Sequence, residues 1–206
     1  MTAPESTARE TTEAELDRVL CAARACRVCA AELPLGPRPV LRARATARLL
    51  IVSQAPGTRV HETGMPFDDP SGVRLRAWLG IDRETFYDQD RIAFVPMGLC
   101  YPGRNPRGGD NPPRAECAPL WHPPLLAALP AVQLTLLVGR YAQRRYLDAR
   151  RGNLTETVRA WADCGPTVLP LPHPSWRNTG WLKRQPWFEA ELVPELRARV
   201  RALLCE

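Results

Sequence analysis

The sequence lacks several features that mark specialised classes of protein. None of its hydrophobic runs approaches the roughly 20 residues that a membrane-spanning helix needs, and no repeat recurs at solenoid periods. The N-terminal stretch MTAPESTARETTEAE is polar and does not resemble a secretory signal peptide. With 206 residues, 45% of them hydrophobic, the chain is long enough to bury a core. We therefore expect one cytoplasmic domain at 11–206, a flexible tail at 1–10, and no membrane partner.

Lysine is almost missing from the sequence. Lys183 is the only one, and all other basic residues are arginine. The formal net charge of +6 favours a polyanionic partner such as nucleic acid. The same arginine bias, together with abundant Ala, Leu and Pro, is typical of a GC-rich genome. Charge alone is therefore weak evidence for such a partner.

Short apolar runs alternate with helical patterns along the chain. Four runs bounded by turn residues are typical of buried strands in a parallel sheet: 49–52, 92–95, 134–138 and 168–171. Segments with helical spacing separate or follow them: 71–79, part of 116–129, 141–147, 155–161 and 186–204. An earlier helix is expected to begin at Thr12, where Glu15 completes a capping box. This alternation predicts the α/β class, as a three-layer α/β/α sandwich with a four-stranded parallel sheet.

The segments that follow the four runs should converge, because ligands bind at the carboxyl ends of parallel strands. The first is 53–72, a long loop with three glycines and three prolines. Its Gly/Pro turn is either an anion-binding nest or an ordinary strand–helix turn. Phe67 is either a loop anchor or a platform for a planar ligand. The loop also contains titratable side chains, which are either solvated charges or site residues: His61, Glu62, Asp68 and Asp69.

His173 follows the fourth run, in a segment made rigid by prolines at 170, 172 and 174. Because proline fixes its own backbone φ, the histidine ring loses little entropy when it binds a ligand. One interpretation is that His173 donates a hydrogen bond to an oxygen that gains negative charge in a reaction. The other is that it is a structural histidine that caps the loop.

Four of the seven cysteines form two pairs. Cys26 and Cys29 are a C-x₂-C pair, whereas Cys100 follows the second run and precedes Cys117 by sixteen intervening residues. Four thiolates suit a structural zinc ion or an iron–sulfur cluster. Such a centre would anchor the irregular 101–113 loop. The alternative is four thiols packed in a reduced core.

These motifs together resemble the uracil-DNA glycosylase superfamily, and within it the iron–sulfur family 4 enzymes. Segments 53–57 and 63–67 match that family's Gly-Glu-Ala-Pro-Gly and Thr-Gly-Arg-Pro-Phe motifs at the family's spacing, and 173–175 is its His-Pro-Ser. The cysteine spacing also matches, and the similarity extends over 20–205. Little-characterised bacterial members with Gln-Ala-Pro-Gly and His-Pro-Ser-x-Arg-Asn are especially similar to this chain.

The resemblance implies a monomeric DNA glycosylase of base-excision repair, associated with the nucleoid, that hydrolyses the N-glycosidic bond of uracil in single- or double-stranded DNA. The base would be flipped out of the stack. The implied substrate-binding residues, with Phe67 as the stacking platform, are Ala55, Pro56, Gly57, Phe67 and Ser175.

The resemblance also implies roles for residues outside the base pocket. His173 would donate to uracil O2, Gln54 would position the water, and Asp68 ranks first as a general base. Side chains expected to contact or wedge into DNA are Trp176, Arg177 and Asn178, with Arg104, Arg107 and Arg184 on phosphates. The implied ligands of a 4Fe–4S cluster, with zinc as the alternative, are Cys26, Cys29, Cys100 and Cys117.

The chain departs from the family pattern in its first motif and after its second run. Ser53 replaces a glycine, Gln54 stands where family 4 has glutamate, and Ala55 stands where family 1 has its aspartate. Pro96 replaces an asparagine that reads the uracil edge. Three alternatives follow: a non-catalytic DNA-binding or damage-sensing protein, a glycosylase for another base such as hypoxanthine, xanthine or thymine, and a nucleotide hydrolase for small substrates.

Overall fold

The computed structural model describes residues 3–106, 108–147 and 152–204. Its four strands form one parallel sheet in the order β2-β1-β3-β4. The strands are β1 (Leu49–Val52), β2 (Ile92–Phe94), β3 (Leu134–Val138) and β4 (Val168–Leu171). The predicted parallel sheet is confirmed, although β2 ends at Phe94 rather than at 95.

Alternate residues of each strand face two separate cores, because successive side chains of a strand point to opposite faces of the sheet. On β1, Leu49 and Ile51 belong to one buried cluster and Leu50 and Val52 to the other. Both faces are therefore covered, which explains why β1 is an unbroken apolar run. The predicted three-layer α/β/α sandwich is confirmed.

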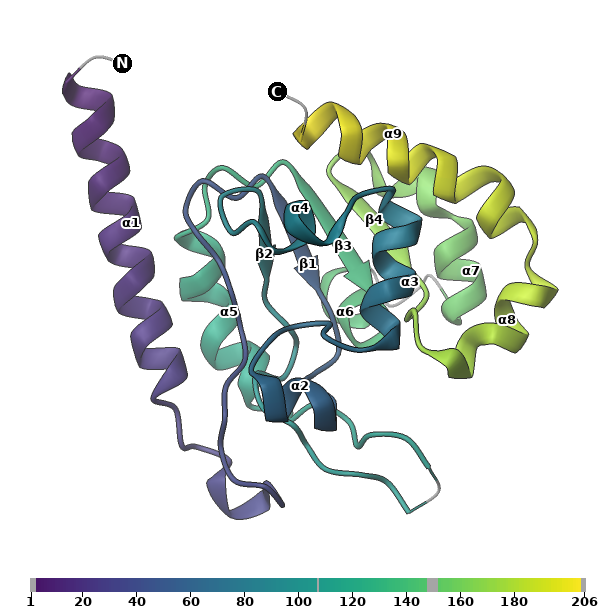
Figure 1. Cartoon of the computed structure of the whole chain (residues 1–206), viewed down its shortest axis with the longest axis horizontal. Coiled ribbons are helices and arrows are strands. Elements are labelled where there is room, and N and C mark those ends of the chain that lie inside the picture. Colours follow the sequence, from purple (N-terminus) through teal and green to yellow (C-terminus); the bar gives the residue numbers. More distant parts are fainter. Residues whose placement is uncertain (1–2, 107, 148–151, 205–206) are drawn as a thin grey trace.

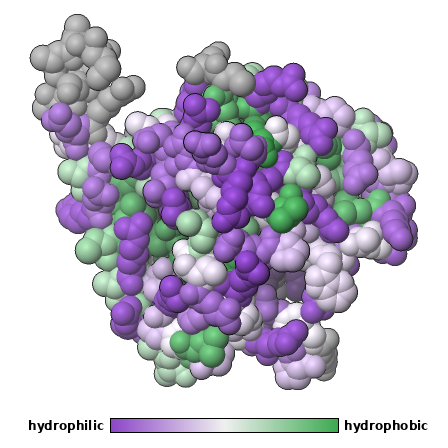
Figure 2. Space-filling model, in the orientation of Figure 1, coloured by the Kyte–Doolittle hydropathy of each residue, from purple (hydrophilic) through white to green (hydrophobic). Residues whose placement is uncertain are grey.

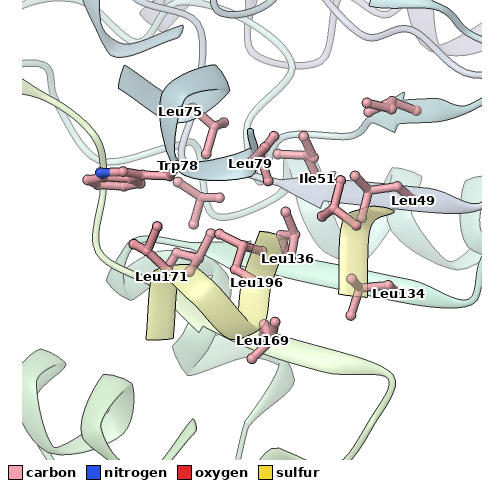
Figure 3. Packing of buried hydrophobic residues seen from close by; sticks show 14 of the residues in the cluster. Leu49, Ile51, Leu75, Trp78, Leu79, Leu134, Leu136, Leu169, Leu171 and Leu196 are labelled. Atoms are coloured by element: carbon pink, nitrogen blue, oxygen red, sulfur yellow. The ribbon is translucent and has the colours of Figure 1, made fainter. Parts of the chain in front are cut away.

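The first core lies beneath α3 (Pro70–Leu79), α4 (Arg83–Tyr87) and α9 (Val193–Leu204). Figure 3 shows Leu75, Trp78 and Leu79 of α3, together with Leu196 of α9, pointing toward the strand leucines. Asp69 starts α3 as its N-cap, since its side chain accepts a hydrogen bond from the Gly72 N–H. This cap fixes the end of α3 that lies nearest the carboxyl edge of the sheet.

The second core lies beneath α1 (Ala3–Arg24), α5 (Cys117–Ala127) and α6 (Arg140–Tyr146). In Figure 1, α1 and α5 lie on one side of the sheet, and α3 and α9 lie on the other. Leu16, Leu20 and Ala23 are the α1 residues buried in this core. The C-terminal half of α1 thus packs against the sheet layer just before the first cysteine pair.

Several element boundaries differ from the sequence-based expectations. α1 begins at Ala3 rather than at Thr12, so the predicted 1–10 tail is helical from Ala3 onward, and residues 1 and 2 lie outside the described residues. Pro4 stands in the first turn, where its missing N–H removes no helical hydrogen bond. α7 (Leu154–Arg159) starts at a capping box of Asn153 and Glu156. The C-terminal helix opens with a π-helical segment, Phe188–Leu192, before α9.

The loops also contain short helices that the sequence did not predict. α2 (Thr58–Thr63) lies within 53–72, which the sequence analysis describes as one long loop. α4 (Arg83–Tyr87) follows α3, and α8 (Thr179–Arg184) follows the His-Pro-Ser segment. Further short turns are η1 (Ala30–Glu32), η3 (Trp161–Cys164) and η4 (Trp176–Asn178).

The surface is mostly polar. Figure 2 shows hydrophilic residues over most of one face, with apolar residues in small separate groups. Among the described residues, Trp176 is the most exposed large hydrophobic residue, with 71% of its surface accessible to solvent. Over the same described residues, none of the helices has the length and apolarity required to cross a membrane.

Candidate active site

A pocket opens at the carboxyl edge of the sheet, where the loops after β1 and β4 meet. Ala55 and Pro56 from the first loop, Phe67 from the same loop further on, and His173 from the loop after β4 all line it. The cavity itself is small, about 40 Å³, and it is open to solvent at its mouth. The two unusual turns of the sequence therefore face one cavity, as their position after parallel strands predicted. Its remaining lining residues are Val40, Ser53, Val60, Pro66, Asp69, Ser71, Phe94 and Pro96.

Phe67 forms one wall of the pocket in an unusual backbone conformation. Its φ is 55°, in the left-handed region that non-glycine residues rarely adopt. Its ring contacts those of Phe86 and Phe94, with centroids 6.1 and 6.0 Å away, which fixes its orientation. A Cβ on Gly72 would lie 1.8 Å from the Phe67 carbonyl oxygen, so only glycine fits at 72. The close approach of Gly72 thus accommodates the turn that holds Phe67 against the pocket.

His173 enters the pocket as a neutral hydrogen-bond donor. The Ser175 backbone N–H donates to its Nδ1 over 3.3 Å, so the neutral ring carries its proton on Nε2. Removal of the ring from water lowers the pKa of His173 to about 4, although the charge of Asp69 acts in the opposite direction. The ring is therefore uncharged at neutral pH and presents an N–H from Nε2.

Hydrogen bonds from neighbouring elements hold the His-Pro-Ser segment in place. Arg74 of α3 donates to the carbonyl oxygens of Pro174 and Ser175 at 3.3 and 3.0 Å. The Asn178 side chain donates to the His173 carbonyl at 2.6 Å. From α6, Gln143 donates to the Leu137 and Leu171 carbonyls at the ends of β3 and β4. The backbone that carries His173 is therefore fixed by α3, by α6 and by its own loop.

Four of the residues predicted to act in catalysis or to bind the base do not line the pocket. Gln54 donates from Nε2 to the Asn111 carbonyl at 3.3 Å and so faces the 101–113 loop. Gly57 is the N-cap residue of α2, and Ser175 offers its backbone N–H to His173. Asp68 pairs with Arg83 at 3.1 Å outside the pocket. Asp69, the neighbour that the sequence also flagged, lines the pocket in its place.

The segment after His173 presents one exposed aromatic residue. Trp176 lies on η4, and the Arg177 guanidinium stacks over its indole ring at 4.9 Å. Trp181, by contrast, packs against the first core and donates from Nε1 to the Thr155 hydroxyl at 2.8 Å. The two tryptophans therefore differ: Trp176 faces solvent, whereas Trp181 is structural. Of the arginines expected on phosphates, Arg107 lies outside the described residues.

The 101–113 loop lies against both the turn at Gly57 and the segment after His173. It folds back on itself through an Asn111 N–H bond to the Gly103 carbonyl at 2.8 Å. Near its tip, Arg177 packs against Gly108 and Gly109, while the Asp110 carboxylate lies 3.5 Å from the position of a Cβ on Gly57. Partial burial raises the pKa of Asp110, and nearby arginines oppose this rise. Sequence analysis had assigned this loop no role at the pocket.

The four paired cysteines surround a second pocket, formed where the N-terminal segment meets the 101–113 loop. Cys26, Cys29, Cys100 and Cys117 all line it, among apolar residues such as Leu33 and Trp121. The Leu99 N–H donates to the Cys117 sulfur at 3.2 Å. Burial raises the pKa of Cys117 to about 11 and, to a lesser extent, those of Cys29 and Cys100.

The thiols are free, and their arrangement does not by itself define a single-ion site. Across 3–106, 108–147 and 152–204, no group of three or more His, Cys, Asp or Glu side chains is placed to hold one metal ion. The two cysteine pairs nevertheless lie together, because all four cysteines line one pocket.

The family model described as the Uracil DNA glycosylase superfamily matches residues 42–197. The matched range contains all four strands, the pocket residues after β1 and β4, and the second cysteine pair. α1 and the first cysteine pair precede it.

Proposed function

The chain belongs to the uracil DNA glycosylase superfamily, whose members generally remove bases from DNA, and on that premise we propose that it hydrolyses the N-glycosidic bond between deoxyribose and uracil. The observation that carries the proposal is the convergence of His173 and Phe67 on one pocket beside Ala55 and Pro56. These residues come from the ends of two strands far apart in the sequence. Together they supply an aromatic wall, a neutral donor and a backbone turn.

In the proposed reaction the target nucleotide leaves the DNA stack before the bond breaks. Unstacking costs about a few kcal/mol and less for a mispaired base, which itself favours uracil opposite guanine. The flipped base enters the pocket and packs against Phe67, whose ring is fixed by its aromatic neighbours. A rigid wall of this kind places the base with little loss of side-chain entropy on binding.

His173 acts where negative charge develops. As the bond to the sugar breaks, the base leaves as an anion with charge on its oxygens, and a donor aimed at such an oxygen stabilises the transition state by about 3–4 kcal/mol. His173 can supply this bond from Nε2 because its Nδ1 is already an acceptor. Its low pKa keeps it a neutral donor, which stabilises the anion without protonating it first.

The face around the pocket mouth suits a polyanionic strand. Trp176 is exposed and backed by Arg177, so its indole can enter the gap that the flipped base leaves. Arg104 of the 101–113 loop and Arg177, which packs against the same loop, supply positive charge for phosphate contacts, which makes affinity fall as salt rises. An exposed aromatic side chain beside basic residues favours DNA over a small nucleotide as the substrate.

We also propose that the four paired cysteines hold a 4Fe–4S cluster. The donor set fits, because four thiols and an N–H donor to sulfur surround an apolar pocket. When bound, the cluster would fasten the N-terminal segment to the 101–113 loop.

The proposal is tested by base release from a panel of oligonucleotides. Single- and double-stranded substrates carry uracil, hypoxanthine, xanthine or mismatched thymine, and abasic products are cleaved by alkali. We expect uracil release by the native chain and a loss of about 10²–10³-fold in His173→Asn. The matched control is Gln133→Asn, at an exposed position before β3 and thus at the opposite edge of the sheet from His173.

The second candidate is a DNA-binding protein without base release, favoured by Gln54 and Ala55 in place of acidic residues. Tight binding of uracil-containing DNA with no release of any base would establish it and overturn the glycosylase proposal. Release of hypoxanthine or xanthine in preference to uracil would instead correct the base. Failure to bind oligonucleotides at low salt would favour hydrolysis of a small substrate.

A further inference from the structure

Cleavage of a glycosidic bond leaves positive charge on the sugar, and a water molecule must then add to C1′. The 53–57 segment of this chain has no charged side chain that could stabilise the sugar or activate the water. Gln54 carries an amide that donates to the Asn111 carbonyl, and Ala55 carries a methyl group. A carboxylate, if one acts, has to come from another part of the pocket.

Asp69 is the acidic residue that lines the pocket. It also lines a groove that runs outside the pocket past Arg59, Asp68 and Arg74. A residue shared by both cavities stands at the rim that separates them. A nucleotide whose base occupied the pocket and whose phosphates stayed outside would place its sugar at this rim.

The capping bond of α3 fixes this carboxylate. Oδ1 of Asp69 accepts from the Gly72 N–H at 2.9 Å, which leaves Oδ2 outside that bond. Asp68, one residue earlier, is directed away and pairs with Arg83. Asp69 therefore lines both the pocket and the groove, whereas Asp68 lines the groove and not the pocket.

The negative charge of Asp69 reaches both sides of the pocket mouth. It acts on the His173 ring, which faces the base, and on Asp110, which belongs to the 101–113 loop. Asp69 and His173 line the same pocket, so a base held by His173 would bring its bond to the sugar near this carboxylate. Placed there, it favours positive charge on the sugar while His173 favours negative charge on the base.

We propose that Asp69 is the catalytic carboxylate of this chain, a deepening that rests on the proposed glycosylase function. Its charge stabilises the oxocarbenium-like sugar as the C1′–N1 electron pair leaves with the base. It then takes a proton from water while the water oxygen forms the new bond to C1′. The products are an abasic sugar with a C1′ hydroxyl and the free base, which takes up the proton.

The test is the single-turnover rate of uracil release in Asp69→Asn, beside the dissociation constant for uracil-containing DNA and the melting temperature. Asparagine caps helices about as well as aspartate, so α3 keeps its start and only the charge is lost. We expect the rate to fall by about 10²-fold or more, the range typical of a lost acid–base group, with binding and melting unchanged. Asp69→Glu should recover part of the rate.

The matched control is Asp82→Asn. Asp82 caps α4 in the same manner, accepting from the Thr85 N–H at 2.7 Å, but lies away from the pocket, so its variant should retain the native rate. A folded Asp69→Asn variant within about threefold of the native rate would overturn the inference. So would a loss confined to Asp68→Asn or Asp110→Asn. Absence of uracil release by the native chain would instead count against the proposed function itself.

Discussion

At the scale of single residues, burial decides the charge of His173 and thereby links stability to pH. An unfolded histidine titrates near pH 6.5, whereas the pKa of His173 in the folded chain is lowered to about 4. Between these values the unfolded chain binds a proton that the folded chain does not. Stability from this group is therefore complete above about pH 6.5 and is lost as the pH falls toward 4.

This linkage gives a measurable difference between the native chain and His173→Asn. We expect the free energy of unfolding of the native chain to fall by about 2 kcal/mol more than that of the variant between pH 7 and pH 4.5. Urea unfolding at several pH values measures both, and all other titrating groups cancel in the comparison. Parallel stability curves would show that His173 is well solvated in the fold.

Single residues also show where prediction from sequence stops. His173, Phe67, Ala55 and Pro56 could be placed at one site because they follow buried runs, and the carboxyl ends of parallel strands must meet. The choice between Asp68 and Asp69 could not be made this way. It depends on the cap of α3, which only the folded backbone reveals.

At the scale of elements, Gln143 links the end of β3 to the end of β4, the strand that leads into the His-Pro-Ser segment. Its amide donates to one carbonyl of β3 and one of β4, at 3.2 and 2.8 Å, and the side chain is buried. Gln143→Met keeps the size of the side chain but removes both of these hydrogen bonds, although the Leu171 carbonyl still accepts from the Gly139 N–H at 2.8 Å. We expect a loss of about 1–3 kcal/mol in unfolding free energy, measured in urea.

The control for this prediction is Gln133→Met, at an exposed position before β3. Its unfolding free energy should stay within about 0.5 kcal/mol of the native value. Equal stabilities of the Gln143 variant and the native chain would mean that water reaches those two carbonyls.

Position in the chain, as well as length, explains which elements could be predicted. The four strands and most helices lie where their apolar pattern placed them. α2, with six residues, lies inside a Gly- and Pro-rich loop, and α4, with five, follows directly after α3, so neither stood out as a separate segment. The start of α1 was wrong because a capping box at Thr12 competes with a sequence that continues as helix from Ala3.

At the scale of the whole molecule, the cysteine pocket joins α1 to the rest of the fold. We expect the purified chain to be brown, with about four iron atoms per chain, and Cys100→Ser to lose the visible absorbance. Cys21→Ser is the control, because Cys21 is exposed on α1 and lies apart from the pocket lining. A colourless chain with one zinc ion would contradict the cluster and keep the four ligands.

The fit between Phe67 and Gly72 has a consequence for the evolution of this fold. With no room for a methyl group at 72, the aromatic wall cannot drift without rebuilding the turn and the start of α3 together. A change of base preference in this pocket is therefore expected to arise at other lining residues, such as Val40, Val60 and Pro96.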